Sequence, residues 1–213
     1  LNIDIIRLDY GFSDEEIIEI SKVYNIAFNA STINEKLAKE IIKVGSNVFA
    51  MHNFYPRPET GLDDKLFVDI NQKLIQMGVN VLAFIPGDEL KRGPLHEGLP
   101  TLEKHRFIPP YVGYLDLAIN FGLEMIFIGD IKLSSLQSKL ITDYINEKVI
   151  KVPVVFDKNY EYLYNQEFTI RIDSPHAVLR LQESREYSCD GELIKPMNTI
   201  KRKVIDFILI TSI

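Results

Sequence analysis

The stretch NVFAMHNFYPRPETGLDDKLFVDINQKLIQMGVNVLAFIPGDE, residues 47–89, decides the fold class. It starts with a short apolar run and passes through a loop into an amphipathic helical pattern. That pattern stops at Gly78, and a second apolar run follows. A glycine just past the last periodic residue is a common helix stop. Two such runs joined by one helix are typical of parallel strands with a crossover helix.

The same alternation extends in both directions along the chain. Short β-type runs lie at residues 3–11, 26–32, 47–54, 79–89 and 124–130. Helical patterns lie at residues 13–24, 32–45, 62–78, 111–122 and 133–148. Ser13 and Glu16 have capping-box spacing, and Ser31 or Thr32 stands where a cap of the second helix is expected. The sequence therefore predicts an α/β fold with a parallel sheet.

After Lys148 the pattern changes to β-type runs without helices between them. These runs are VIKVPVVF, EFTIRID, HAVLRLQ and KVIDFILITSI, at residues 149–156, 167–173, 176–182 and 203–213. We therefore expect two domains, an α/β domain over residues 1–148 and a mainly β domain over residues 149–213.

Composition narrows the class of protein. The chain has 213 residues, a net charge of −6 and one cysteine, Cys189. A basic face for nucleic acid is not expected, and no apolar run is long enough for a membrane span. The single cysteine and the absence of a signal-peptide pattern favour a cytoplasmic protein. The chain begins directly inside a strand-like run, which predicts a missing N-terminal segment.

Polar residues gather where the predicted strands end, and ligands of parallel barrels meet these ends. They include Asp9, Asn29, His52, Asn53, Arg57, Glu59 and Asp130. The alternative role is helix capping. The capping role is the weaker explanation for Asp9 and Asn29, because Ser13 and Ser31 or Thr32 stand at the cap positions. For Asp130, capping and ligand binding are equally good explanations. His52 is as well explained by a satisfied core histidine as by a ligand.

The face to which Asp9 points follows from strand alternation. In IIRLD, Arg7 and Asp9 lie on one face of the strand and Ile6 and Leu8 on the other. A charged pair against a helix layer is expensive to bury, so we expect Arg7 and Asp9 to point away from the helices. Arg7 is then expected to pair with Asp9.

A second dense segment, KRGPLHEGLPTLEKHR, spans residues 91–106. Its cations Lys91, Arg92 and Arg106 flank two glycines and a short helix that Thr101 is expected to cap. Arginines bind phosphate bidentately, and long ordered loops are usually functional. The alternative is a solvated basic loop. The segment thus predicts a phosphate-binding loop.

The sequence lacks the motifs of several other kinds of enzyme chemistry. No paired histidines with metal-ligand spacing, no glycine-rich nucleotide fingerprint and no Gly-x-Ser-x-Gly elbow occur. Carboxylates, amides, aromatic rings and arginines remain, and glycosidases use such residues, with two carboxyl groups for the acid and base steps. No metal and no cofactor are expected. An isomerase acting on a sugar phosphate is a weaker alternative, because no lysine or histidine pair stands at a strand end.

With both segments in view, the chain resembles the 6-phospho-N-acetylmuramidase family, formerly outer surface proteins or a domain of unknown function. The matching motifs, in order, are RLDYGFS, NAST, HNFYPRPETGLD, AFIPG, RGPLHEGLPTLEKHR and IGD. The resemblance implies a (β/α)8 TIM-type barrel followed by a small cyclophilin-like β domain. It also implies hydrolysis of a 6-phosphorylated N-acetylmuramic acid–N-acetylglucosamine disaccharide in cell-wall recycling.

This chain departs from the family pattern at both ends. The likeness begins at what would be the fourth barrel strand, so strands four to eight are expected, and the last residues, VIDFILITSI, do not continue the pattern. We therefore expect a partial barrel and an incomplete cyclophilin-like domain, with either impaired hydrolysis or a non-catalytic phosphosugar-binding remnant. A homo-oligomer or a further N-terminal segment would complete it.

The resemblance and the strand-end residues together give the site prediction. The candidate catalytic carboxylates are Asp9, Glu59, Glu103 and Asp130, without assignment of acid and nucleophile or base. The ligand is a small phosphosugar, and its candidate binding residues are Asn29, His52, Asn53, Tyr55, Arg57, Lys91, Arg92, Arg106 and Arg185.

Overall fold

The computed structural model describes residues 4–32, 35–44, 47–156, 158–175 and 179–183. The chain divides into two compact units, Leu1–Lys151 and Val152–Ile213. That these units are part of an eight-stranded barrel and part of a cyclophilin-like domain stays a prediction.

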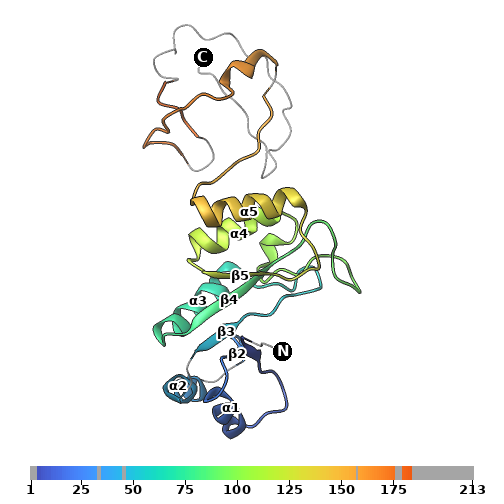
Figure 1. The fold of residues 1–213 in the computed structure, drawn as a ribbon, viewed down its shortest axis with the longest axis vertical. Helices are drawn as coiled ribbons and strands as arrows, with labels where there is room; N and C mark the ends of the chain where they lie inside the picture. The colour runs from blue at the N-terminus through green and yellow to red at the C-terminus, as the bar shows by residue number, and fades with distance from the viewer. Residues whose placement is uncertain (1–3, 33–34, 45–46, 157, 176–178, 184–213) are drawn as a thin grey trace. The chain divides into compact units, whose positions relative to one another are not determined.

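The first unit is a mixed α/β fold with a curled five-stranded parallel sheet (Figure 1). The strands pair in chain order, each with its neighbour, so the sequence prediction of a parallel sheet is confirmed. They are β1 (Ile6–Arg7), β2 (Ile26–Asn29), β3 (Val48–Met51), β4 (Asn80–Ile85) and β5 (Met125–Ile128). The helices are α1 (Asp14–Ser21), α2 (Glu35–Val44), α3 (Asp64–Gln76), α4 (Pro110–Leu115) and α5 (Ser135–Glu147).

Helix starts follow local chemistry. Ser13 and Glu16 form the expected capping box at α1, with the Glu16 backbone N–H 3.2 Å from Ser13 Oγ. Helix α5 is capped by Ser134, so Asp130 is not its cap. The described part of α2 begins at Glu35, and residues 33–34 lie outside the described residues, so the cap at Ser31 or Thr32 stays a prediction.

The two faces of the sheet differ in character. Ile6 and Leu8 of the β1 segment pack in one cluster with Ile17 and Ile20 of α1. Further along the sheet, the cluster that contains Phe67 of α3 takes in alternate residues of the strands, among them Phe28, Ala50, Val81, Ala83 and Ile85. Because side chains alternate along a strand, the residues between them point to the opposite face, which we call the open face.

The predicted fourth helix divides into two parts. Helix α4 ends at Leu115, and a π-helical turn, η2 (Asp116–Asn120), continues it to two residues before the end of the predicted range. Asp116 in this turn accepts a hydrogen bond from the buried His105 ring at 2.8 Å. This contact ties η2 to the short 3₁₀ helix η1 (Glu103–His105).

The second unit contains the 3₁₀ helix η3 (Lys158–Leu163). The expected β runs at 167–173 and 176–182 meet in an antiparallel bridge between Ile170 and Leu181. The run at 149–156 forms no strand, which corrects that expectation. Pro153 within it has no N–H to donate to a ladder, and Val155 is exposed. The run at 203–213 lies outside the described residues.

None of the helices in the described part of the chain is both long enough and apolar enough to cross a membrane.

Candidate active site

The polar ends of β1, β2 and β3 meet on the open face. Arg7 donates from Nη2 to Asn53 Oδ1 at 2.7 Å and from Nη1 to Met51 Sδ at 3.4 Å. Asn29 donates from Nδ2 to the same Asn53 oxygen at 3.5 Å. The predicted residues Asn29 and Asn53 are thus brought together, and Arg7, which the site prediction left out, joins them.

Asp9 lies two residues beyond the end of β1 and is exposed. The expected orientation of Arg7 away from the helices is confirmed by its contacts with Asn53 and Met51. The expected pair between Arg7 and Asp9 is not formed within the described residues. Arg7 instead uses the amide oxygen of Asn53, which the loop after β3 places 2.7 Å away.

His52 turns to the opposite face from Asn53. Its side chain is fully buried, its Nε2 lies 2.7 Å from Asn71 Oδ1 of α3, and its ring packs on Phe67 at 4.7 Å. Burial lowers the pKa of the His52 imidazole, although the Asn71 contact opposes that shift. His52 therefore packs in the helix–sheet core, which is the alternative that the sequence left open, and its contact with a ligand stays a prediction.

Tyr55 lies half-buried beside this amide group. Burial raises the pKa of the Tyr55 phenol, and the Ser31 side chain opposes that shift. Ser31 in turn donates its backbone N–H to Asn29 Oδ1 at 2.9 Å. A chain of polar contacts therefore links the loops after β2 and β3.

Arg106 is 2% exposed, and its side chain joins the loop after β3 to the loop after β4. Its Nε and Nη2 donate to the two oxygens of Glu103, each at 2.6 Å. The remaining N–H groups donate to the backbone oxygens of Tyr55, Gly98 and Arg57 at 2.9–3.0 Å. All five guanidinium donors have acceptors within the chain, so no N–H of Arg106 is free for the predicted phosphate contact in this structure.

Glu103 is held as firmly as its partner. Its carboxylate also accepts the backbone N–H groups of Glu59 and Gly61 at 2.9 and 2.8 Å. These contacts, the Arg106 hydrogen bonds first, lower the pKa of Glu103 to about 2. Gly61 has to be a glycine here, because a Cβ would stand 2.7 Å from Glu103. Glu103 is therefore ionised and engaged at both oxygens, which leaves it a loop-fixing role.

Asp130 is 7% exposed and fixes the loop after β4 to the end of β5. It accepts backbone N–H groups from Gly87, Leu99 and Arg92 at 2.8, 3.0 and 2.9 Å. The fit is tight, since a Cβ on Gly129 would come within 2.2 Å of the Leu99 oxygen. Asp130 thus caps no helix and organises loop backbone instead.

Thr101 has a similar linking role rather than the predicted role as a cap. Its buried hydroxyl donates to the Asn53 carbonyl at 2.9 Å and accepts the Phe84 N–H at 3.0 Å. It therefore joins β4 to the loop after β3, because its position two residues before η1 leaves it out of the cap.

An aromatic group with a cation above it lies next to the amide group. Phe54 meets Phe84 edge-on at 5.3 Å, and Phe84 lies 6.0 Å from Phe127 of β5. The exposed Arg92 guanidinium stands 5.6 Å from the centre of the Phe54 ring. An aromatic face beside a cation suits a sugar ring that carries an anionic group.

The other predicted residues lie around this group. Glu59 and Arg57 are exposed in the loop after β3, and Glu59 has a left-handed backbone with φ of 66°. Lys91 is half-buried beside Arg92. Arg185 lies outside the described residues. In the described part of the chain, no three acidic, histidine or cysteine side chains could hold a metal ion together.

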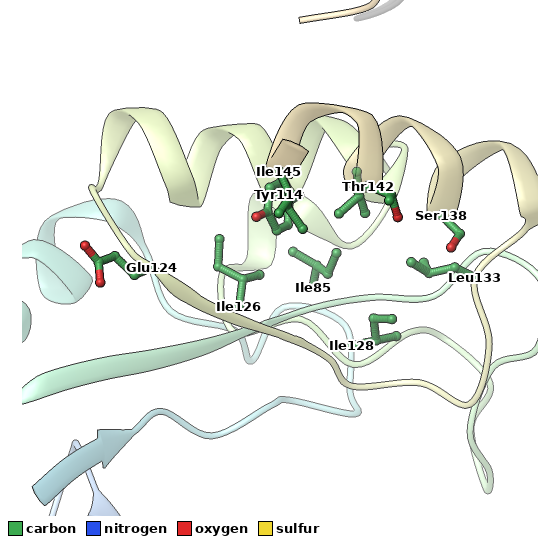
Figure 2. A pocket seen from close by; sticks show the side chains of 10 residues that line it. Ile85, Tyr114, Glu124, Ile126, Ile128, Leu133, Ser138, Thr142 and Ile145 are labelled. Atoms are coloured by element: carbon green, nitrogen blue, oxygen red, sulfur yellow. The ribbon is translucent and has the colours of Figure 1, made fainter. Parts of the chain in front are cut away.

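A cavity of about 310 Å³ with a mixed polar and apolar lining lies on the other side of the sheet, between β5 and α5 (Figure 2). Ile85, Ile126 and Ile128 line it from the strands, Tyr114 and Ile145 line it from the helices α4 and α5, and Leu133 lines it from the loop before α5. None of the predicted site residues reaches it. The cavity is therefore separate from the candidate site on the open face.

Comparison with solved structures finds two similar proteins. A crystal structure of a conserved Enterococcus faecalis protein of unknown function matches with a TM-score of 0.71 and 32% identity, over 80% of this chain and 49% of that one. An uncharacterized B. cereus protein matches with a TM-score of 0.56 and 28% identity, over 63% of this chain and 41% of that one. The chain thus spans about half the length of these solved structures. No curated protein matches.

The family comparison covers the unit that carries the candidate site. Residues 1–143 match the family described as 6-phospho-N-acetylmuramidase, N-terminal. This range takes in all five strands and every predicted site residue except Arg185. The chain belongs to the 6-phospho-N-acetylmuramidase family.

Proposed function

We propose that this chain binds a 6-phosphorylated N-acetylmuramic acid glycoside and hydrolyses its glycosidic bond. The observation that carries the proposal is the open face itself, where Arg92 stands over the Phe54 ring beside the Arg7–Asn53 pair. The ring would pack on a sugar face, and the guanidinium of Arg92 would bind the phosphate. Membership in the family supports this substrate class.

Of the four candidate carboxylates, Asp9 and Glu59 suit the chemistry best. Glu103 and Asp130 are engaged by donors of the chain itself. Asp9 and Glu59 are exposed, and their carboxylates make no hydrogen bond or ion pair within the described residues. One carboxyl group would protonate the leaving oxygen, and the other would act as base toward water or as nucleophile. Which residue takes which part stays open.

The decisive experiment is a hydrolysis assay with the phosphorylated disaccharide. The 213-residue chain and the longer E. faecalis protein would be incubated with it, and release of N-acetylglucosamine would be followed by mass spectrometry. We expect release that depends on the 6-phosphate, which the unphosphorylated disaccharide tests. Release by neither protein would refute the hydrolase proposal.

A second function is favoured by a specific observation. Two of the four candidate carboxylates are committed to loop structure, and the chain spans 49% of the E. faecalis protein. A phosphosugar-binding protein without hydrolysis fits these facts. Calorimetry separates the two, because the binding protein would give heat with the phosphosugar and release no product.

A further inference from the structure

We infer that Arg7, with Asn29 and Asn53, forms a subsite for a carboxylate of the substrate, distinct from the phosphate contact of Arg92. This inference rests on the proposed phosphosugar function. The carboxylate in question is the lactyl group, which muramic acid carries and glucosamine lacks. Arg7 would therefore decide between these two sugars.

The first argument is the unmatched charge of Arg7. Its guanidinium forms no ion pair with a carboxylate anywhere in residues 4–32, 35–44, 47–156, 158–175 and 179–183. Its partners there are neutral, the Asn53 oxygen and the Met51 sulfur. By contrast, Arg106 has the Glu103 carboxylate and three carbonyl oxygens. A partly buried cation without a counter-ion favours an incoming anion.

The second argument is the supply of free donors. Arg7 uses one N–H on each terminal nitrogen, so a second N–H on each is left for a ligand, whereas its Nε–H is buried without a partner in the described structure. The Asn53 oxygen accepts from Arg7, so the orientation of that amide is fixed. Its NH2 group donates to nothing in the described part of the chain. Arginine and amide donors side by side suit the two oxygens of a carboxylate.

The third argument is the position of the two arginines. Arg7 contacts Asn53, and Arg92 covers the ring of the next residue, Phe54. Both cations therefore flank one short segment at the end of β3. A sugar packed on Phe54 that carries a carboxylate on one side of the ring and a phosphate on the other would meet one arginine with each anion.

The test compares two ligands that differ in the lactyl group, N-acetylmuramic acid 6-phosphate and N-acetylglucosamine 6-phosphate. Their affinities would be measured by calorimetry with the 213-residue chain, with Arg7→Gln and with the control Arg180→Gln, an exposed arginine of the second unit. We expect Arg7→Gln to weaken the muramic ligand about tenfold to a hundredfold and the glucosamine ligand less than about threefold. Arg180→Gln is expected to change neither.

A second variant, Arg7→Lys, keeps the positive charge and loses the paired N–H donors of the guanidinium. It keeps the inference testable if Arg7→Gln fails to fold. It is expected to weaken the muramic ligand selectively, though less than Arg7→Gln does. Equal losses for both ligands, or no loss, would overturn the carboxylate subsite while phosphosugar binding stands. Binding of neither ligand by the unaltered chain would overturn subsite and binding together. Binding of the muramic ligand without any hydrolysis of the disaccharide would contradict only the proposed reaction and not the subsite.

Discussion

At the scale of single residues, three arginines of one chain have three different environments. Arg106 is enclosed by acceptors, Arg92 lies over an aromatic ring in the open, and Arg7 has only neutral partners. Side-chain type alone suggested a phosphate contact for Arg106 and none for Arg7. The acceptors within reach decide which cation is left for a ligand.

The first prediction concerns Asp9. Asp9→Asn is expected to preserve the fold, because the side chain is exposed, and to lower turnover about a hundredfold or more, the scale of a lost acid–base group. Thermal melting and initial rates on the phosphorylated disaccharide check the two parts. Asp14→Asn, an exposed change in the first turn of α1, serves as the control. Near-normal turnover of Asp9→Asn would move the assignment to Glu59.

The second prediction concerns Arg92 and the phosphate. Arg92→Ala is expected to weaken a 6-phosphorylated sugar by about 1.5–3 kcal/mol and its unphosphorylated analogue far less, since a charge-assisted contact is lost. Calorimetry with both ligands measures the difference. Equal losses would show that Arg92 serves the ring-packing face, and the phosphate contact would then pass to Lys91.

At the scale of elements, the site rests on two loops that are fixed to each other. The loop after β3 and the loop after β4 meet through the Glu103–Arg106 pair and Thr101. Asp130 adds the end of β5 to the same assembly. The polar groups that looked catalytic in sequence thus hold loop backbone in place, which positions Phe54 and Arg92.

The third prediction is a pH-dependent loss of stability when this loop pair is broken. Glu103→Gln leaves the buried Arg106 charge without its counter-ion, so the free energy of unfolding is expected to fall by about 3 kcal/mol at pH 7. Denaturant unfolding measures it, with the exposed Glu97→Gln as control.

The sign of the pH effect follows from the lowered pKa of Glu103. A carboxyl whose pKa falls from 4.5 in the unfolded chain to about 2 in the folded one adds stability above pH 4.5. That stability is lost as the pH falls toward 2. The gap between the unaltered chain and Glu103→Gln is therefore expected to close over this range. A gap that stays constant from pH 7 to pH 2 would contradict the prediction.

At the scale of the whole α/β unit, the curled sheet ends at β1 and β5, each of which pairs with one neighbour among the described strands. Phe127 and Ile128 of β5 are 41% and 44% exposed. Unpaired, apolar edge strands are templates for association with other chains.

The fourth prediction is that the chain self-associates through the β5 edge and that Phe127→Lys weakens this association. Removing an exposed apolar ring and adding an edge lysine is expected to raise the dissociation constant about tenfold or more. Sedimentation equilibrium over a range of protein concentrations measures it. Phe107→Lys, at a 75% exposed position outside the strands, is the matched control. An equal effect of both variants would show a general surface effect rather than association through β5.

Periodicity along the chain determined most of the fold of the first unit. The predicted strand at 79–89 contains β4, and the predicted helix at 62–78 contains α3, because apolar spacing and glycine stops act locally. Alternation in IIRLD likewise placed Arg7 on the face away from the helices. The motifs also identified the family, whose match covers residues 1–143.

Only the tertiary structure decided which polar residues are available for a ligand. His52 found Asn71 of α3, Arg106 found Glu103 and three carbonyl oxygens, and Asp130 found three N–H groups. Apart from Glu103, which lies three residues before Arg106, these partners are distant in sequence or depend on loop backbone, so no local pattern reveals them. The hydrogen bond between Arg7 and Asn53 was hidden for the same reason, because the two residues are 46 positions apart in the sequence. Hydrogen-bond satisfaction is a property of the packed chain, and it separates structural polar groups from those left free to bind.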